Sequence, residues 1–247
     1  MSERDSAGAA SERDGAATGP GARPPLRIGV DLDNTIVCYD GLFHRLALEG
    51  GLIPAGLPRS KSAVRAHLCA ADREDVWTEM QGEAYGPRMV DAHAFDGAEA
   101  FFAECARRAV PVSIVSHRTR SPYRGPAHDL HAAARGWLDR SGILALAGGE
   151  VFLETDRDAK VRRIAELGCT HFVDDLADFL DELAAVEGLE RIHFDPSGAH
   201  DHGSGAASMR CVDSWRQIAG LLLAGPDASG QGQPQDRARE KSREKGG

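Results

Sequence analysis

The chain has 247 residues, of which 42% are hydrophobic and 27% charged, and its formal net charge is −9 at neutral pH. This size and composition are typical of a globular protein with one sizeable domain, or a core domain with a smaller insert. The acidic balance argues against a general nucleic-acid or anionic-membrane binder, and the sequence holds no apolar run of membrane-spanning length.

The cysteines form no CxxC pair and are odd in number. There are five of them: Cys38, Cys69, Cys105, Cys169 and Cys211. This pattern indicates reduced thiols rather than a disulfide framework or a zinc site. The N-terminus also lacks the hydrophobic segment of a secretory signal. We therefore expect a cytoplasmic protein.

Both ends of the chain differ in composition from the rest. Residues 1–25 are rich in Ala, Gly, Ser, Arg and Asp, and residues 225–247 contain the run GQGQPQDRAREKSREKGG. Such segments bury too little apolar surface to fold. We expect two disordered tails on either side of an ordered region.

The first predicted strand covers residues 26–33, where an apolar run contains Asp31 and Asp33. Carboxylates avoid buried strands unless they are paired or bind a metal. Two aspartates at the end of a core strand therefore need a chemical explanation.

The next region, residues 41–93, contains no convincing strand. Its pattern predicts three helices: one around residues 42–48, one after Ser60 and one after Asp72, separated by glycines and prolines. This region is therefore predicted to be a helical insert between the first and second core strands.

Beyond the insert, amphipathic helices alternate with strands. Asp96 can cap a helix whose apolar residues recur at i, i+3, i+4 and i+7, from Ala98 to Cys105. The strand AVPVSIVSH then ends at Ser116. Another helix is predicted to begin near Thr155 as its N-cap and to end before a glycine.

The rest of the ordered region continues this alternation. THFVDD, ERIHFDP and SMRCV predict strands, with one helix after the first and a last helix around Trp215. Such alternation implies parallel pairing with helices on both faces. The predicted fold is a doubly wound, Rossmann-like parallel sheet formed by residues 26–40 and 94–224, with residues 41–93 as a small inserted α-helical unit.

Polar residues gather where the predicted strands end. They are Asp31, Asp33, Ser116, Asp174 and Asp175, with Lys160 at the start of a helix. Each has an ordinary interpretation as a turn residue, an N-cap or a surface charge. In open α/β sheets, however, ligands bind outside the carboxyl ends of the strands. Carboxylates converging there would repel one another without a cation, and oxygen ligands of this kind suit Mg²⁺.

The order of these residues resembles the haloacid dehalogenase-like (HAD) superfamily. Its first motif, DxDx(T/V) after a hydrophobic strand, is matched by DLDNT at residues 31–35. The second, a Ser or Thr after a strand, is matched by Ser116. The third and fourth, a lysine and then an acidic pair, are matched by Lys160 and by DD in HFVDD. The resemblance covers the whole predicted core.

The resemblance implies a role for each residue. Asp31 would be the nucleophile, and Asp33 would protonate the leaving oxygen and later activate water. Mg²⁺ would be held by Asp31, by the backbone carbonyl of Asp33, and by one residue of the acidic pair. Ser116 and Lys160 would bind the transferring phosphoryl group. The dehalogenases of the superfamily lack the second aspartate, so its presence favours phosphoryl transfer.

The insert occupies the place of the family's helical (C1-type) cap. Caps close over the site and contact the substrate. Because this one is small, we expect a small phosphorylated molecule rather than a protein substrate. The candidate contacts are Trp77, Gln81, Tyr85, Arg88, His117 and Arg118. Packing or solvation is the competing interpretation for each of them.

The sequence therefore predicts a Mg²⁺-dependent phosphatase of a small phosphorylated metabolite, acting through an aspartyl-phosphate. The enzymatic alternatives are a nucleotide or polynucleotide-end phosphatase, which the overall acidity disfavours, and a phosphotransferase or mutase using the same intermediate. The non-enzymatic alternative is a phosphoacceptor or binding module. No membrane partner is expected, and the sequence indicates neither the substrate nor the oligomeric state.

Overall fold

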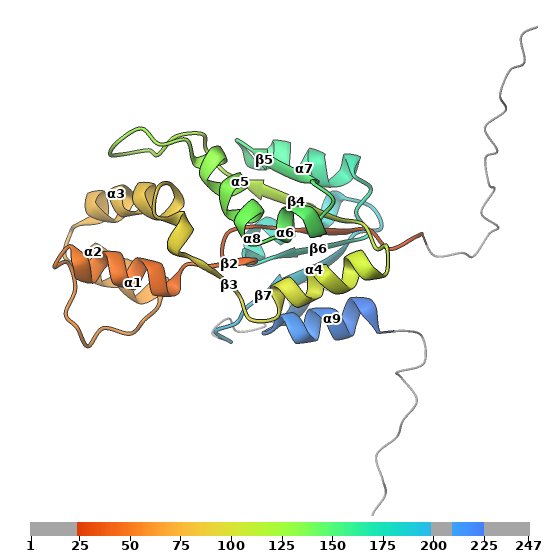
Figure 1. Cartoon of the computed structure of the whole chain (residues 1–247), viewed down its shortest axis with the longest axis horizontal. Helices are drawn as coiled ribbons and strands as arrows, with labels where there is room; N and C mark the ends of the chain where they lie inside the picture. Colours follow the sequence, from red (N-terminus) through yellow and green to blue (C-terminus); the bar gives the residue numbers. More distant parts are fainter. Residues whose placement is uncertain (1–23, 199–208, 225–247) are drawn as a thin grey trace, which may run out of the picture.

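The core is a six-stranded sheet in the order β5-β4-β1-β6-β7-β8 (Figure 1). The computed structural model describes residues 24–198 and 209–224. Every neighbouring pair in the sheet is parallel. The strands are β1 (Ile28–Val30), β4 (Val112–His117), β5 (Val151–Glu154), β6 (His171–Asp174), β7 (Glu190–Phe194) and β8 (Met209–Val212). The predicted doubly wound sheet is confirmed, and the predicted tails, apart from residues 24–25, lie outside the described part of the chain.

The strand order reverses beside β1. The chain runs from β1 to β4 and β5 on one side, and then crosses back to β6, β7 and β8 on the other. In open α/β sheets, ligands bind in the crevice outside the carboxyl ends at such a switch point. The crevice here lies between the ends of β1 and β6.

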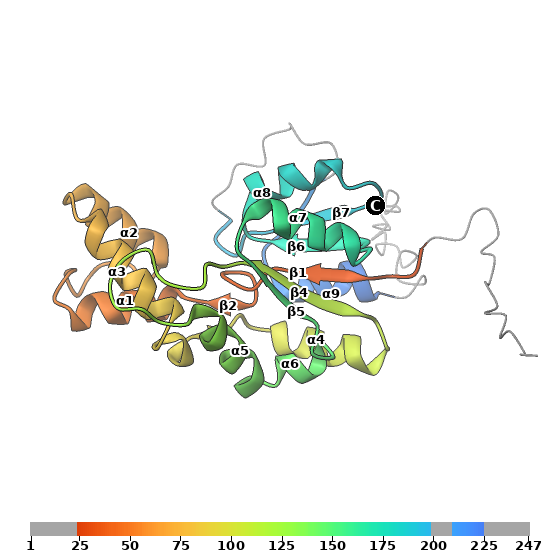
Figure 2. The same ribbon diagram turned by 90° about the horizontal axis from the view of Figure 1, so that it is seen from above.

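Two layers of helices enclose the sheet, one on each face (Figure 2). One face is covered by α4 (Ala98–Arg107), α5 (Leu130–Arg140), α6 (Ile143–Leu146) and α9 (Trp215–Leu223). The other is covered by α7 (Arg157–Glu166), α8 (Ala177–Glu182) and the short η2 (Leu183–Ala185). The apolar stripe predicted from Ala98 to Cys105 is fully buried on the first face. No helix in the described ranges is long and apolar enough to cross a membrane.

Two predicted helix caps are wrong by one residue. Helix α4 begins after Gly97, whose φ of 89° is left-handed, and Asp96 does not cap it. Helix α7 is capped by Asp156, which accepts a hydrogen bond from the Ala159 N–H at 2.7 Å, rather than by Thr155. In both places a neighbouring residue also fits an N-cap, so local sequence does not fix the first turn.

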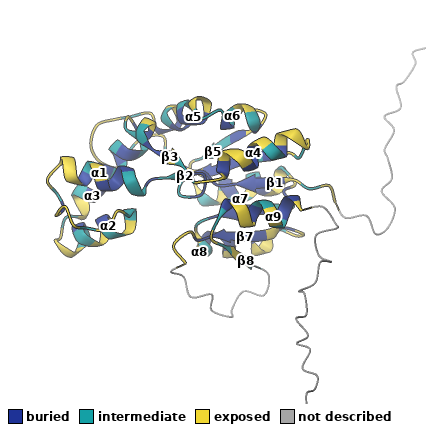
Figure 3. Ribbon diagram, turned by 60° about the horizontal axis from the view of Figure 1, so that its bottom comes forward, coloured by how far each residue is buried: buried dark blue, intermediate teal, exposed yellow. Residues whose placement is uncertain are grey.

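Residues 40–85 form the predicted three-helix unit, which projects from one end of the sheet (Figure 1). Its helices are α1 (Asp40–Glu49), α2 (Lys61–Ala70) and α3 (Glu74–Tyr85), followed by the short η1 (Met89–Asp91). The faces that the helices turn toward one another are buried (Figure 3). At their centre Phe43 stacks on Trp77 with ring centroids 4.7 Å apart.

A two-stranded antiparallel ribbon joins this unit to the core. It consists of β2 (Val37–Cys38) and β3 (His93–Ala94), with Val37 opposite Ala94 and Cys38 opposite His93. The prediction that residues 41–93 contain no strand is therefore wrong at its last residue. A strand of two residues is too short to show an alternating pattern.

Gly29, the middle residue of β1, is needed for the packing of the central strand. A Cβ at this position would lie 2.5 Å from Cδ2 of the buried Phe172 and 3.0 Å from Cys169 Sγ. We expect Gly29→Ala to lower the free energy of unfolding by about 1–3 kcal/mol through overpacking, measured by urea denaturation. The matched control is Gly220→Ala in α9. An added Cβ there would have no atom within 4 Å apart from the nearby backbone of its own helix, and alanine should stabilise the helix by about 0.5–1 kcal/mol. Equal stability of the two variants would contradict this expectation.

Candidate active site

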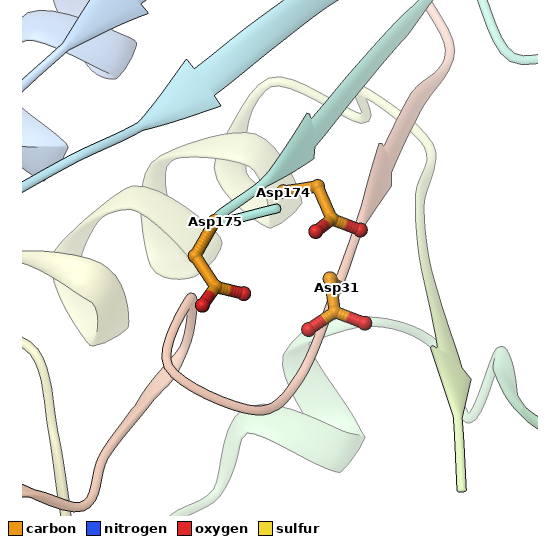
Figure 4. Close-up of side chains that lie close together, drawn as sticks. All are labelled: Asp31, Asp174 and Asp175. Carbon is orange, nitrogen blue, oxygen red and sulfur yellow. The ribbon is translucent and has the colours of Figure 1, made fainter. Parts of the chain in front are cut away.

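Three carboxylates converge where β1 and β6 end (Figure 4). Asp31 follows β1, and its N–H donates to the carbonyl of Val173 at 2.9 Å. Asp174 is the last residue of β6 and Asp175 follows it. One oxygen from each carboxylate lies within 4.8 Å of the other two. The structure thus brings together three of the four residues predicted to hold a metal.

Lys160 supplies the positive charge at this point. Its ammonium donates to Asp31 Oδ1 at 2.6 Å and to Asp174 Oδ2 at 2.7 Å, and the side chain is only 3% exposed. The ammonium also lies 4.2 Å from the ring centroid of Phe179. Burial opposes the charge on Lys160, but the two carboxylates outweigh it and raise the pKa of this lysine. Lys160 therefore stays protonated.

One ammonium does not balance three carboxylates, of which Asp31 and Asp174 are buried and Asp175 is half-buried. Burial raises the pKa of Asp31 to about 7, with the charges of Asp174 and Asp33 adding to the effect and Lys160 opposing it. Burial likewise raises the pKa of Asp175 well above its usual range. A cation bound between these oxygens would favour their charged forms. The all-oxygen donor set fits Mg²⁺, so the predicted ligand chemistry matches the side chains present.

Ser116 lies on the other side of β1, near the end of β4. Its hydroxyl is buried and has no hydrogen-bond partner among the described residues. Leaving a buried hydroxyl unpaired costs about 1–3 kcal/mol. The predicted role in binding a phosphoryl oxygen would satisfy this group.

Asp33 is held away from the other carboxylates by two buried side chains. The Tyr39 hydroxyl donates to Asp33 Oδ1 at 2.7 Å, and Arg118 forms an ion pair with the same carboxylate. Arg118 also donates to the backbone carbonyls of Tyr85 at 3.0 Å and Leu130 at 3.3 Å. The Asp33 side chain therefore occupies one defined position beside the site.

The site opens into a cavity of about 380 Å³ between the sheet and the three-helix unit. Asp31, Ser116 and Lys160 line it from the core, and Gln81 and Tyr85 line it from α3. Asp33 and Asp175 also border it. This volume lies within the range of small-molecule sites.

The candidate substrate contacts divide into two groups. Gln81, Tyr85, His117 and Arg118 line the cavity. Trp77 instead lies inside the three-helix unit, and Arg88 forms ion pairs with Glu49 and Asp91 outside the cavity lining. Trp77 therefore serves packing and Arg88 serves ion pairing, and neither residue lies where it could contact a ligand in the cavity.

Sequence reasoning assigned no role to three residues at the site. Tyr39 binds Asp33, and the Thr35 hydroxyl donates to Asp175 Oδ1 at 3.5 Å. Lys61, at the start of α2, lines the cavity. A lysine in the first turn of a helix opposes the helix dipole, and this signal in the sequence could have pointed to Lys61.

Comparison by sequence finds nothing: no family model and no curated protein matches the chain. Solved structures match over most of its length. A HAD family hydrolase from Deinococcus radiodurans, with bound phosphate and sodium, is 18% identical with a TM-score of 0.51 and covers 81% of this chain and 96% of its own. A dehalogenase is 15% identical with a TM-score of 0.54, covering 83% and 100%. The magnesium-bound HAD-type protein YfnB from Bacillus subtilis is 14% identical with a TM-score of 0.50, covering 81% and 100%.

Identities this low are informative about the backbone rather than the reaction. The parallel sheet flanked by helices agrees with the fold of these structures. The chain therefore has the haloacid dehalogenase-like fold.

Proposed function

We propose that this chain is a phosphohydrolase that removes the phosphoryl group from a small phosphate monoester through an aspartyl-phosphate on Asp31. The observation that carries the proposal is the buried group of Asp31, Asp174 and Lys160, of which Asp31 and Lys160 line the cavity together with Ser116 and its unpaired hydroxyl. A divalent cation bound here would offset the negative charges of the carboxylates and of a dianionic phosphoryl group, and Lys160 and Ser116 would bind the oxygens of that group.

The first half of the reaction uses the two aspartates of DLDNT. Asp31 attacks phosphorus, so that a bond forms between its carboxylate oxygen and phosphorus while the ester P–O bond breaks. Asp33 gives its proton to the leaving oxygen. Lys160 and the Ser116 hydroxyl hold the equatorial oxygens of the phosphoryl group. When bound, Mg²⁺ would supply charge neutralisation between the nucleophile and the phosphate.

In the second half, Asp33 takes a proton from water, whose oxygen attacks phosphorus. The bond between phosphorus and Asp31 breaks, and inorganic phosphate leaves. Arg118 and Tyr39 would keep the Asp33 carboxylate oriented for both proton transfers.

The second aspartate also separates this proposal from the dehalogenation named for one similar structure. Attack on carbon needs no proton donor for a halide leaving group, whereas an alkoxide leaving group does. Release of inorganic phosphate from 4-nitrophenyl phosphate, with no halide release from 2-haloacids, would support phosphoryl transfer. Recovery of the phosphoryl group on an added alcohol instead of water would support the phosphotransferase alternative.

Metal removal is the direct test of the carboxylate cluster. We expect EDTA treatment to lower hydrolysis of 4-nitrophenyl phosphate by about 10³-fold or more, because a bound metal typically supplies several kcal/mol of transition-state stabilisation. Added Mg²⁺ should restore the rate, and Asp174→Asn should raise the Mg²⁺ concentration needed for half-maximal activity. Full activity after thorough chelation would contradict the metal assignment.

A further inference from the structure

Lys61 brings a third cation to the cavity, beside Lys160 and Arg118, and the proposed mechanism does not use it. It is the first residue of α2, where its N–H donates to Asp40 Oδ1 at 2.8 Å. Helix α2 already has its own cap, since Ser60 accepts from the Ala63 N–H at 3.1 Å. A lysine at a helix N-terminus opposes the helix dipole. Helix stability therefore does not explain this residue.

The ammonium of Lys61 rests on aromatic rings rather than on a carboxylate. It lies 5.6 Å from the ring centroid of Tyr85 and 5.7 Å from that of Phe43. No carboxylate in the described part of the chain forms an ion pair with it, whereas the other two cations near the site, Lys160 and Arg118, are both paired. Burial opposes its charge, but Tyr85 and the nearby Asp175 and Asp33 outweigh burial and raise the pKa of Lys61. Lys61 is thus protonated, and among the described residues no carboxylate lies within ion-pair distance of its ammonium.

The position of Lys61 matches the leaving part of a substrate. It lines the cavity from the three-helix unit together with Thr78 and Gln81, whereas Ser116 and Lys160 line it from the core. A phosphoryl group held at the core end would direct the rest of its ester toward α2 and α3. That end of the cavity offers the ammonium of Lys61 and the amide of Gln81, whereas the Thr78 hydroxyl donates to the Glu74 carbonyl at 2.9 Å.

We infer that Lys61 binds an anionic group on the leaving part of the substrate, so that the preferred substrates are phosphate monoesters whose alcohol carries a second negative charge. The inference rests on the proposed function of the same site. The charge can come from a carboxylate or from a second phosphate, because both accept charge-assisted hydrogen bonds from an ammonium.

Three esters of one chain length test the inference: propyl phosphate, 3-phosphooxypropanoate and propane-1,3-diyl bisphosphate. The wild-type protein should have a higher kcat/KM for one or both charged esters than for propyl phosphate, and which of the two is preferred identifies the source of the charge. In Lys61→Met this preference should fall by about 10- to 100-fold, the effect of losing a hydrogen bond to a charged group. Lys61→Arg should restore part of it.

The matched control is Arg65→Met, which removes one charge from an exposed position of the same helix outside the cavity lining and should keep the preference. A wild-type protein without preference, or equal losses on charged and uncharged esters in Lys61→Met, would overturn the inference.

A binding measurement separates this inference from the proposed function. By calorimetry, one or both of the non-hydrolysable 3-phosphonopropanoate and propane-1,3-diylbisphosphonate should bind more tightly than propylphosphonate, and Lys61→Met should abolish the difference. Tighter binding without phosphate release from any ester would contradict the proposed function alone. Phosphate release with no tighter binding of either charged phosphonate than of propylphosphonate would contradict the inference alone.

Discussion

Replacing Asp31 with asparagine should abolish turnover of every phosphate ester, by about 10⁴-fold or more, because an amide oxygen is too weak a nucleophile to attack phosphorus. The substitution nearly preserves shape, and Lys160 keeps its contact with Asp174. The variant should therefore fold. Intact mass after rapid acid quench should show no phosphorylated protein.

Asp33→Asn is the matched variant, since it changes one carboxylate to an amide two residues away and leaves the nucleophile in place. It should slow turnover by about 10²–10⁴-fold, the usual contribution of a general acid–base group. With 4-nitrophenyl phosphate the leaving group needs little protonation, so attack by Asp31 should suffer less than the water step. The phosphorylated protein should then accumulate. Phosphate found on Asp31→Asn, or on Ser116, would show that the roles are wrong.

Replacing Lys160 with methionine should have the largest effect on stability. Asp31 and Asp174 would remain buried with no cation between them, and breaking a buried ion pair by removing one partner typically costs about 3–5 kcal/mol. Urea denaturation in EDTA should show this loss. Added Mg²⁺ should recover part of it, because a divalent cation can occupy the space between the same oxygens.

The pH dependence of this loss follows from the carboxylates. Burial already raises the pKa of Asp31 to about 7 with Lys160 present. A carboxyl group with a raised folded-state pKa contributes stability that is present at low pH and is lost as pH rises through that value. Lys160 lowers the pKa of Asp31, so this pKa should be higher still in Lys160→Met. The deficit of Lys160→Met relative to wild type should therefore shrink as the pH falls from above 7 to about 7, and change little at lower pH.

Arg157→Met is the control for Lys160→Met, since it removes a cation from the same helix. Arg157 forms ion pairs with Asp178 and Glu182 at the surface, where such pairs are worth less than about 1 kcal/mol. Similar losses in the two variants would mean that the Lys160 site is hydrated, and the buried-charge argument would then fail.

The elements that sequence reasoning predicted correctly are those with long apolar patterns. The stripe from Ala98 to Cys105 repeats over two turns and is buried as expected. Residues Asp31, Asp174 and Lys160 also meet as expected, because the carboxyl ends of neighbouring parallel strands share one edge of the sheet. Local pattern and sheet geometry were sufficient for both.

The features that sequence reasoning missed are either elements of only a few residues or contacts between residues far apart in the sequence. Strand β5 has only four residues, so its apolar pattern is too short to recognise. The ion pair of Arg118 with Asp33 joins residues 85 positions apart. A single sequence carries no signal that those two side chains meet, and the same holds for Lys61 and the cavity it lines.

The ribbon of β2 and β3 has a consequence for how this protein can change over evolutionary time. The chain leaves the core at Cys38 and returns at His93, and these two residues are paired directly across the ribbon. The segment between them therefore begins and ends at neighbouring positions. A recombination or insertion event can exchange residues 39–92 as a single segment without changing the order or direction of any strand in the sheet. Because Lys61, Gln81 and Tyr85 all belong to that segment, one such exchange replaces the part of the cavity lining that the three-helix unit contributes, while Asp31, Lys160 and Asp174 keep their places.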